Sequence, residues 1–215
     1  RVCIRDICPE AILVCMPVQW IAGSGIYANS FVYRNILIDA GVPPMAVQPY
    51  ADAIETIVIT HAHYDHIAHL REIVRICGDP AVSIHEADAA GLADDARSLS
   101  LLFGARSPGI VPDVILRDGD RVGSLHVIHT PGHTPGGICL YDPETWVLFS
   151  GDTVFCGGSF GRYDFPGGDR VALAASIERL TELDVEGLYP GHGEPVTRGG
   201  GRHIAAAREA LRYYG

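Results

Sequence analysis

The sequence predicts an α/β protein in which two β-sheets pack face to face and helices cover their outer faces. Strand-like and helix-like stretches alternate along the chain, and each half of the chain combines strands with helix. With 215 residues, 47% of them hydrophobic, the chain can bury a sizeable core. Because sheets and helices must each bury an apolar face against another element, two such halves indicate a sandwich. We find no internal repeat and expect one domain over residues 1–215.

The first half of the chain begins with apolar, strand-like runs. A polar turn at Tyr33-Arg34-Asn35 joins two of them into a hairpin that ends at Gly41. Apolar residues at helical spacing then predict a helix over Ile67–Ile76. The remaining elements expected here are strands at Ala11–Val18, Ser30–Val32, Ile36–Gly41, Thr56–Thr60 and Ala81–His85, and a short acidic helix at Glu86–Leu92.

The second half begins with residues 93–112, which carry two proline-containing turns and no clean period, so we expect a mobile flap. A glycine-rich loop follows the later strands, from Gly157 to Gly168. The elements expected are strands at Val114–Leu116, Leu125–His129, Ile138–Tyr141, Trp146–Ser150 and Gly187–Tyr189, and helices at Asp169–Leu183 and His203–Tyr213.

Composition narrows the function classes. The net charge of −10 argues against a nucleic-acid partner, and all sixteen basic residues are arginine, which excludes a lysine nucleophile. No apolar run approaches the roughly 18–20 residues that span a bilayer, and no signal-peptide pattern opens the sequence, so we expect a cytoplasmic protein without membrane contact. Cys3, Cys8 and Cys15 lie close enough in sequence to form a disulfide, although buried small hydrophobic residues are the simpler interpretation.

A cluster of histidines follows the β-branched run Thr56–Thr60. His61 and His63 are alternate residues at a strand end, so their side chains can converge on one ion. The chain then turns into a helix, where Asp65 and His66 can face a neighbouring point. Imidazole and carboxylate donors together suit Zn, Fe or Mn. The cluster therefore predicts a metal site, against the alternative of a solvated, histidine-rich turn.

Three further turns place a polar residue beside glycine or proline directly after a strand. They contain His133, Asp152 and His192. Small neighbours allow the backbone to fold close to a bound ion. Each turn alone would be an ordinary turn, but their occurrence together with the histidine cluster indicates metal ligands.

In these four segments the sequence resembles the metallo-β-lactamase superfamily, in particular its glyoxalase II-like (hydroxyacylglutathione hydrolase-like) branch. The resemblance implies a four-layer αββα sandwich of two mixed β-sheets with helices outside. It also implies two divalent metal ions, zinc foremost and iron or manganese next, and a small-molecule substrate. The matching motifs are His61-Ala62-His63-Tyr64-Asp65-His66, Pro131-Gly132-His133-Thr134, Gly151-Asp152 and Pro190-Gly191-His192-Gly193, with Ile38-Asp39-Ala40-Gly41 before them.

The resemblance also implies a role for each ligand. His61, His63 and His133 hold one ion, Asp65, His66 and His192 hold the other, and Asp152 bridges them. The reaction implied is hydrolysis of a thioester, ester or lactone by a metal-activated hydroxide. Asp65 would also receive the proton, which makes it the catalytic residue.

The loop after the bridging aspartate resembles the corresponding loop of small glyoxalase II-like hydrolases. Arg162 and Tyr163 are therefore candidates for substrate binding, while an internal pair between Arg162 and Asp164 that holds the loop is the alternative. Tyr27 and Tyr64 are candidate wall residues. We expect the remaining histidines to be surface, packing or supporting residues and not ligands: His69, His85, His126, His129 and His203.

The sequence departs from the family pattern in two places. Ile67-Ala68-His69-Leu70 stands where many relatives have glycine, and little chain follows His192, whereas glyoxalase II enzymes carry a further helical region that contacts glutathione. We therefore disfavour a glutathione thioester as the natural substrate, and the sequence does not fix the oligomeric state, for which a homodimer is one candidate. Two other functions compete: a mononuclear iron persulfide dioxygenase that uses His61, His133 and Asp152, and a non-catalytic binding scaffold.

Overall fold

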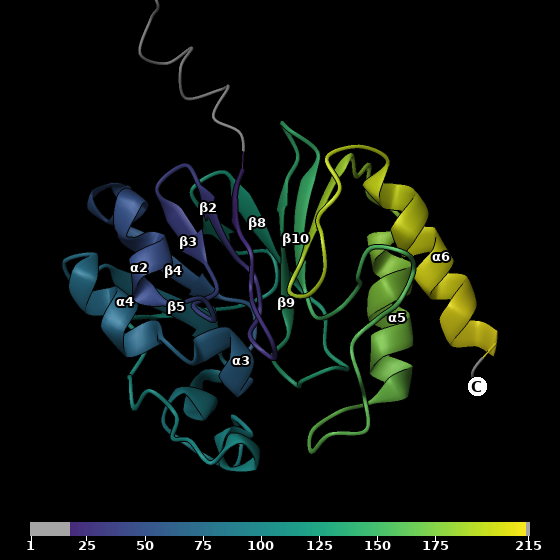
Figure 1. The fold of residues 1–215 in the computed structure, drawn as a ribbon. Helices are drawn as coiled ribbons and strands as arrows, with labels where there is room; N and C mark the ends of the chain where they lie inside the picture. Colours follow the sequence, from purple (N-terminus) through teal and green to yellow (C-terminus); the bar gives the residue numbers. More distant parts are fainter. Residues whose placement is uncertain (1–17, 214–215) are drawn as a thin grey trace, which may run out of the picture.

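The computed structural model describes residues 18–213, which form two sheets face to face with helices outside both (Figure 1). Most of the predicted strand at Ala11–Val18, and Cys3, Cys8 and Cys15, lie outside the described residues. The predicted α/β sandwich of two mixed sheets is confirmed.

The first sheet has six strands in the order of the chain, antiparallel over its first two pairings and parallel from β3 onward. The hairpin between β2 and β3 closes at Arg34, whose φ of 57° fits a tight turn. The strands are β1 (Gln19–Ile21), β2 (Ser30–Tyr33), β3 (Ile36–Ile38), β4 (Thr56–Ile59), β5 (Ala81–His85) and β6 (Val114–Leu116).

The second sheet has five strands in the order β11-β10-β9-β8-β7, of which only β10 and β11 are parallel neighbours. Because β9 runs against both β8 and β10, the carboxyl ends of β8, β10 and β11 meet at one edge. The strands are β7 (Arg121–Val122), β8 (Leu125–His129), β9 (Ile138–Asp142), β10 (Val147–Gly151) and β11 (Gly187–Pro190).

Helices cover the outer face of each sheet. The first sheet is covered by helices from the first half of the chain, and α5 and α6 cover the second, so that the layers run helix, sheet, sheet, helix (Figure 1). The helices are α2 (Pro44–Val47), α3 (Tyr64–Ile67), α4 (Leu70–Ile76), α5 (Arg170–Leu180) and α6 (Gly200–Tyr213), and the 3-10 turns are Gln48–Ala53, Ala89–Leu92 and Ser100–Phe103.

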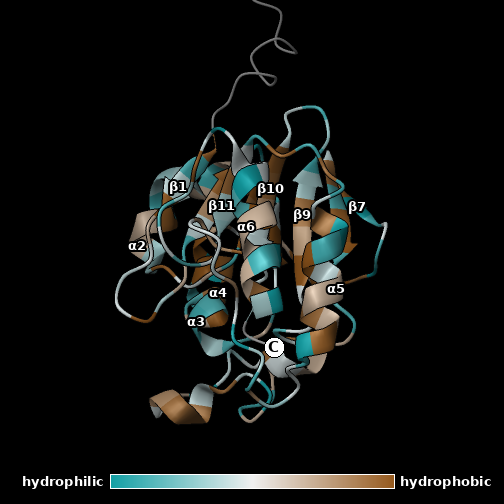
Figure 2. Ribbon diagram, turned by 90° about the vertical axis from the view of Figure 1, so that its right-hand side faces the viewer, coloured by the Kyte–Doolittle hydropathy of each residue, from teal (hydrophilic) through white to brown (hydrophobic). Residues whose placement is uncertain are grey.

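Alternating side chains of the strands divide the interior into three apolar layers. On β4, Val58 faces the other sheet, whereas Ile57 and Ile59 face the helices. Between the sheets, Phe149 packs its ring against those of Phe31, Tyr33 and Tyr189, with centroids 5.3–5.6 Å apart. Figure 2 looks onto α5 and α6 and shows polar and apolar bands alternating along α6. Three cores of this kind separate four layers.

The predicted helix over Ile67–Ile76 is wrong in its boundaries. The helical stretch begins at Tyr64 and breaks at His69, which has φ −113° and ψ 11°. A continuous helix would use the carbonyl of His66 internally, but that carbonyl accepts from the backbone N–H of Ala40 at 2.8 Å. Pairing with the loop after β3 therefore divides the helix.

The segment 93–112 is more structured than its sequence indicates. The carboxylate of Asp95 accepts hydrogen bonds from the backbone N–H and hydroxyl of Ser107, both at 2.8 Å, and pairs with Arg106. The segment contains the 3-10 turn Ser100–Phe103 and lies below α3 at the bottom of Figure 1. The sequence pattern did not reveal this turn, and the expected mobility of the segment stays a prediction.

Other boundaries differ by less. The acidic helix expected at Glu86–Leu92 shrinks to the 3-10 turn Ala89–Leu92, because the N–H groups of Ala87 and Asp88 bond back to His85. The last helix begins at Gly200, and the sequence pattern missed α2 and β7. Among the described helices, none has both the length and the apolar character needed to cross a membrane.

Candidate metal centre

Seven imidazole and carboxylate side chains converge at the edge where the carboxyl ends of β4, β8, β10 and β11 meet. They form two groups, and within each group the possible ligand atoms all lie within 4.8 Å of one another. The first group is His61, His63 and His133; the second is Asp65, His66, Asp152 and His192. All seven residues proposed from the sequence are therefore brought together.

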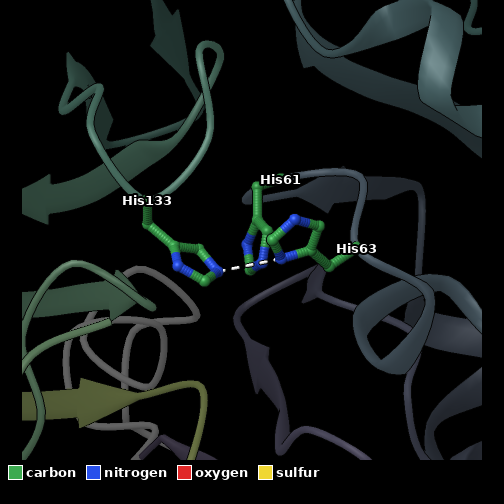
Figure 3. Close-up of side chains that lie close together, drawn as sticks. All are labelled: His61, His63 and His133. Carbon is green, nitrogen blue, oxygen red and sulfur yellow. Dashed lines mark hydrogen bonds between the residues drawn. The ribbon is translucent and has the colours of Figure 1, made fainter. Parts of the chain in front are cut away.

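The first group is a closely packed histidine triad (Figure 3). The ring of His61 lies 4.8 Å from the rings of both His63 and His133, and all three side chains are at most 5% exposed. The Nδ1 atom of His63 lies 2.9 Å from the Nε2 atom of His133. Three imidazole nitrogens thus surround one point, as a tetrahedral ion with one further position requires.

The second group is richer in negative charge. The Nε2 atom of His192 lies 2.9 Å from an oxygen of Asp65, and the Nε2 atom of His66 lies 3.2 Å from Asp152. Asp152 also approaches the first group, with its Oδ2 atom 3.5 Å from the Nε2 atom of His133. Asp152 therefore stands between the two groups, which is the place of a bridging carboxylate.

Several of these atoms are buried but lack a hydrogen-bond partner. Within the described residues this holds for Nε2 of His61, and also for Nε2 of His66 and Oδ1 of Asp152, which lie 3.2 Å apart without forming a hydrogen bond. A buried polar atom without a partner costs free energy of about 1–3 kcal/mol, so such atoms are rare unless a ligand satisfies them. Since three of them face one centre, the donor set fits bound metal ions.

Hydrogen bonds from behind orient the donor rings. The Nδ1 atom of His133 donates a hydrogen bond to the backbone carbonyl of Arg162 at 2.6 Å. With the proton on Nδ1, the lone pair of Nε2 can bind an ion. Asp39, 2% exposed and with φ of 59°, lies 2.8 Å from Nδ1 of His66 and accepts from the hydroxyl of Thr60, also at 2.8 Å. Asp39 and Thr60 thus fix the second group from below.

The protonation states suit cation binding. Burial, aided by the neighbouring His133, lowers the pKa of His63 to about 3, and burial likewise holds the pKa of His61 well below its ordinary value. Both rings are therefore neutral and able to donate a lone pair at neutral pH. Burial by itself lowers the pKa of His66, but Asp39 and Asp152 together raise it well above its ordinary value. The second group thus lies in a field that attracts positive charge.

The carboxylates of the second group are ionised at neutral pH. Burial tends to raise the pKa of both Asp65 and Asp152, but the nearby imidazoles, His66 foremost, together outweigh it and lower both values. Bonding to His192 lowers the pKa of Asp65 further. Each carboxylate is therefore available as a ligand or a proton acceptor.

Two supporting residues had no signal in the sequence. Asp88, 7% exposed, accepts from the backbone N–H of Ala62 at 3.1 Å and of Gly136 at 2.7 Å, so that one carboxylate joins the two loops of the first group. Asn29 donates to the carbonyls of Pro190 and Gly193 on either side of His192. Both side chains lie far in sequence from the residues they hold, so no local pattern reveals them.

Glycine is required where the loops approach the donors. A Cβ atom at Gly191 would lie 2.3 Å from Oδ1 of Asp152 and 2.6 Å from Cε1 of His66, closer than any real contact. A Cβ atom at Gly161 would lie 2.9 Å from Nδ1 of His133. The expectation that small residues let the backbone fold close to the site is therefore met at these positions.

A cavity of about 410 Å³ opens onto the centre. Arg162 lines it, but its guanidinium pairs with both oxygens of Asp164, at 2.9 and 2.7 Å. Tyr163 packs instead against the apolar cluster under α5 and α6. The ring of Tyr64 stacks on that of Phe103 in the 93–112 segment. The substrate-binding roles of Arg162 and Tyr163 stay predictions.

The other histidines lie outside both groups. His85, 4% exposed, stacks on His129 with centroids 4.0 Å apart, and His69 contacts the ring of Tyr27. His203 accepts from the N–H of Gly157 at 2.8 Å. None of these side chains belongs to a donor group, as the sequence led us to expect, although His69, expected on the surface of a helix, packs on Tyr27.

Comparison with known proteins agrees with this geometry. A profile of the family described as the metallo-beta-lactamase superfamily matches residues 24–192. A probable metallo-hydrolase of Methanocaldococcus jannaschii is 33% identical over 191 residues, which cover 80% of this chain and 90% of that protein. In Gallus gallus, the acyl-coenzyme A thioesterase MBLAC2 is 30% identical over 211 residues, covering 79% of this chain and 73% of that protein.

A solved structure shares both fold and sequence. The protein TTHA1623, crystallised in a di-iron-bound form, superposes with a TM-score of 0.74 at 31% identity. The match covers 91% of this chain and 97% of that one.

Proposed function

The chain belongs to the metallo-β-lactamase superfamily, and from this we propose that it is a metal-dependent hydrolase that cleaves a small thioester or a related ester or lactone. The observation that carries the proposal is the pair of donor groups, which meet at Asp152 and leave buried nitrogen and oxygen atoms unsatisfied. A binding scaffold would have no need for such a costly arrangement beside an open cavity.

Each donor group would hold one divalent ion, zinc foremost, with Asp152 shared between them. Ions held there would supply a water of lowered pKa at neutral pH and polarise the carbonyl of the substrate. The second group supports the assignment of a second ion. Asp65, His66 and His192 each offer one possible ligand atom, and these atoms lie within 4.8 Å of one another. A mononuclear centre would leave His66 and His192 without a role as ligands.

Asp65 is the residue we assign to proton transfer. It is ionised at neutral pH, its side chain is 18% exposed, and it lines the cavity. One of its oxygens is 2.9 Å from Nε2 of His192, which fixes the carboxylate in place. A held and ionised carboxylate at the floor of the cavity can accept the proton of the attacking water and deliver it to the leaving group.

Thioesters are the substrate class that we favour. One relative is named as an acyl-coenzyme A thioesterase, and this chain spans most of its length. The sequence also resembles the glyoxalase II-like branch in its ligand motifs. Hydrolysis through this centre needs no serine or cysteine nucleophile, in keeping with Cys139, whose burial raises the pKa of its thiol to about 11.

The test is metal analysis together with a substrate panel of thioesters, lactones and persulfides, on protein purified without added metal. We expect two ions per chain and thioester cleavage. His61→Ala should lose the ion of the first group and activity while keeping the fold, and His203→Ala is the matched control. One iron per chain with oxygen uptake on a persulfide would establish the dioxygenase instead.

A further inference from the structure

We propose that the cavity beside the metal centre binds an apolar acyl chain, and that the turn Ser100–Phe103 sets which chain lengths are accepted. The inference rests on the proposed function, since it names the acyl half of the thioester that this centre would cleave. Leu102 and Phe103 are the specificity-determining residues.

The cavity joins the donors to an apolar wall. Five of the seven metal-donor residues line it: His63, Asp65, His133, Asp152 and His192. Its other walls are mainly apolar side chains, namely Ile26, Leu99, Leu102, Phe103, Phe155, Phe160 and Phe165. A thioester whose carbonyl lies at the donors would therefore place its acyl substituent against hydrocarbon and aromatic rings.

The wall offers little to a charged acyl group. Apart from the donors, Arg162 is the charged side chain among the residues that line the cavity. Its guanidinium is paired with Asp164 and lies 4.2 Å from the centroid of the Phe165 ring, so its charge is already matched. An acyl group that carried a carboxylate would find no unpaired cationic side chain on this wall, whereas an alkyl chain would contact apolar side chains along its length.

The outer part of the wall is exposed in the free protein. Leu102 is 67% exposed, Ile26 47% and Phe103 43%. Large apolar side chains that gather at the mouth of a cavity indicate a surface that a ligand covers, because covering them removes apolar area from water. An acyl chain that extends from the donors would cover these side chains.

The turn is held in position relative to the donors. The ring of Phe103 stacks on that of Tyr64 with centroids 5.6 Å apart, and the N–H of Tyr64 donates to the carbonyl of Ser98 at 2.7 Å. Tyr64 lies between His63 and Asp65 in the chain, so the wall and the donors form one unit. Leu99, with φ of 60° and 8% exposed, keeps a left-handed backbone that a leucine rarely adopts. A fixed wall can discriminate chain length.

The experiment measures kcat/KM for acyl thioesters of one thiol, from acetyl through butanoyl and hexanoyl to octanoyl. We expect kcat/KM to rise about fourfold for each methylene that the cavity buries. Leu102→Ala and Phe103→Ala should flatten this rise, with octanoyl losing at least tenfold and acetyl changing little. Leu101→Ala is the matched control, because Leu101 is 58% exposed on the same turn but does not line the cavity.

Binding of non-hydrolysable alkyl thioethers of the same lengths, measured by calorimetry, gives a second readout. If the affinity for the thioethers rises with chain length but none of the thioesters is hydrolysed, the proposed function is wrong and the acyl cavity is supported. Hydrolysis with a flat length profile, or an equal loss for all lengths in Leu102→Ala, would overturn the acyl cavity alone. A change of oligomeric state in Leu102→Ala with an unchanged profile would show that the turn covers a second copy, and would likewise overturn it.

Discussion

At the scale of single residues, Asp88 shows how one carboxylate can position a site without touching it. Its two oxygens accept N–H groups from the loop of His61 and His63 and from the loop of His133. Neither loop has another carboxylate at this junction among the described contacts. We infer that Asp88 is a positioning residue for the first donor group.

Replacing Asp88 by Asn tests this role. The amide would keep one acceptor and turn an N–H₂ group towards the N–H of Ala62 or Gly136, so the two loops should separate slightly. We expect the affinity for the first ion to fall about 10–100-fold, as for other supporting residues of metal sites. Equilibrium dialysis against zinc measures it, with Asp113→Asn as the control, since Asp113 accepts a backbone N–H from Val82 away from the centre. Equal affinities in the two variants would contradict the role.

The side chain of Asp142 is fully buried and links β9 to β2 by a hydrogen bond with Tyr33. It accepts from the hydroxyls of Tyr33 at 2.7 Å and Ser124 at 2.6 Å. Burial alone would raise the pKa of Asp142, but these hydroxyls lower it below 3.8. The ionised form is therefore favoured by folding, and its contribution is complete above the unfolded pKa and lost as the pH falls through the lower folded value.

We expect Asp142→Asn to lower the free energy of unfolding by about 1–3 kcal/mol at pH 7, because buried hydroxyls lose an ionised acceptor. The difference from the unmodified protein should shrink as the pH falls below the unfolded pKa, because the carboxyl then binds a proton in the unfolded chain before it does in the native protein. Urea unfolding at a series of pH values measures it. Glu144→Gln, at a side chain 75% exposed, should change stability little. A difference that stays constant down to pH 2 would exclude the ionised carboxylate as its source.

At the scale of elements, the start of α5 supports the loop that carries His133. The carboxylate of Asp169 caps the helix by accepting from the N–H groups of Val171 and Ala172, at 2.8 and 3.0 Å. The backbone N–H of Asp169 donates to Gly132, where a Cβ atom would lie 2.2 Å from the nitrogen of Leu173. The helix and the loop before His133 therefore touch backbone to backbone.

Loss of this cap should weaken the helix and leave the donors in place. Asp169→Ala should reduce the free energy of unfolding by about 1 kcal/mol, and Asp169→Ser, which keeps a capping oxygen, should recover most of it. The midpoint of urea unfolding, with an unchanged slope, is the measurement. Equal midpoints for the alanine and serine variants would show that the cap contributes nothing.

At the scale of the whole molecule, the metal centre joins the two sheets. Its donors follow strands of both, and the N–H of Ile138 on β9 donates across the gap to the carbonyl of Thr60 after β4, at 3.0 Å. Bound ions would therefore stabilise the contact between the sheets as well as the loops, because the unfolded chain has no such site.

Removal of metal should consequently lower the thermal stability of the protein. At free zinc one thousandfold above its dissociation constant, binding would add about 4 kcal/mol to the free energy of unfolding. Calorimetry with zinc and with a chelator measures the shift in Tm. Asp152→Ala should lose most of it because its carboxylate serves both groups, and an undiminished shift in that variant would mean that zinc acts elsewhere.

The sequence alone determined the class of the fold and the identity of the donors. Short apolar runs are local and predict strands such as β4 and β8, and donors directly after strand ends, such as His61 and Asp152, can be found in the sequence without any coordinates. The sequence also predicted α5 and α6, apart from their ends.

Only the tertiary structure decided what supports the donors and which side chains line the cavity above them. The break at His69, the carboxylate of Asp88 between two loops and the apolar turn at Leu102 all depend on residues distant in sequence. The physical reason is that a backbone N–H or carbonyl is satisfied by whichever partner the fold brings near, and no local pattern records that partner. The histidine cluster could be read from the sequence, whereas the cavity above it could not.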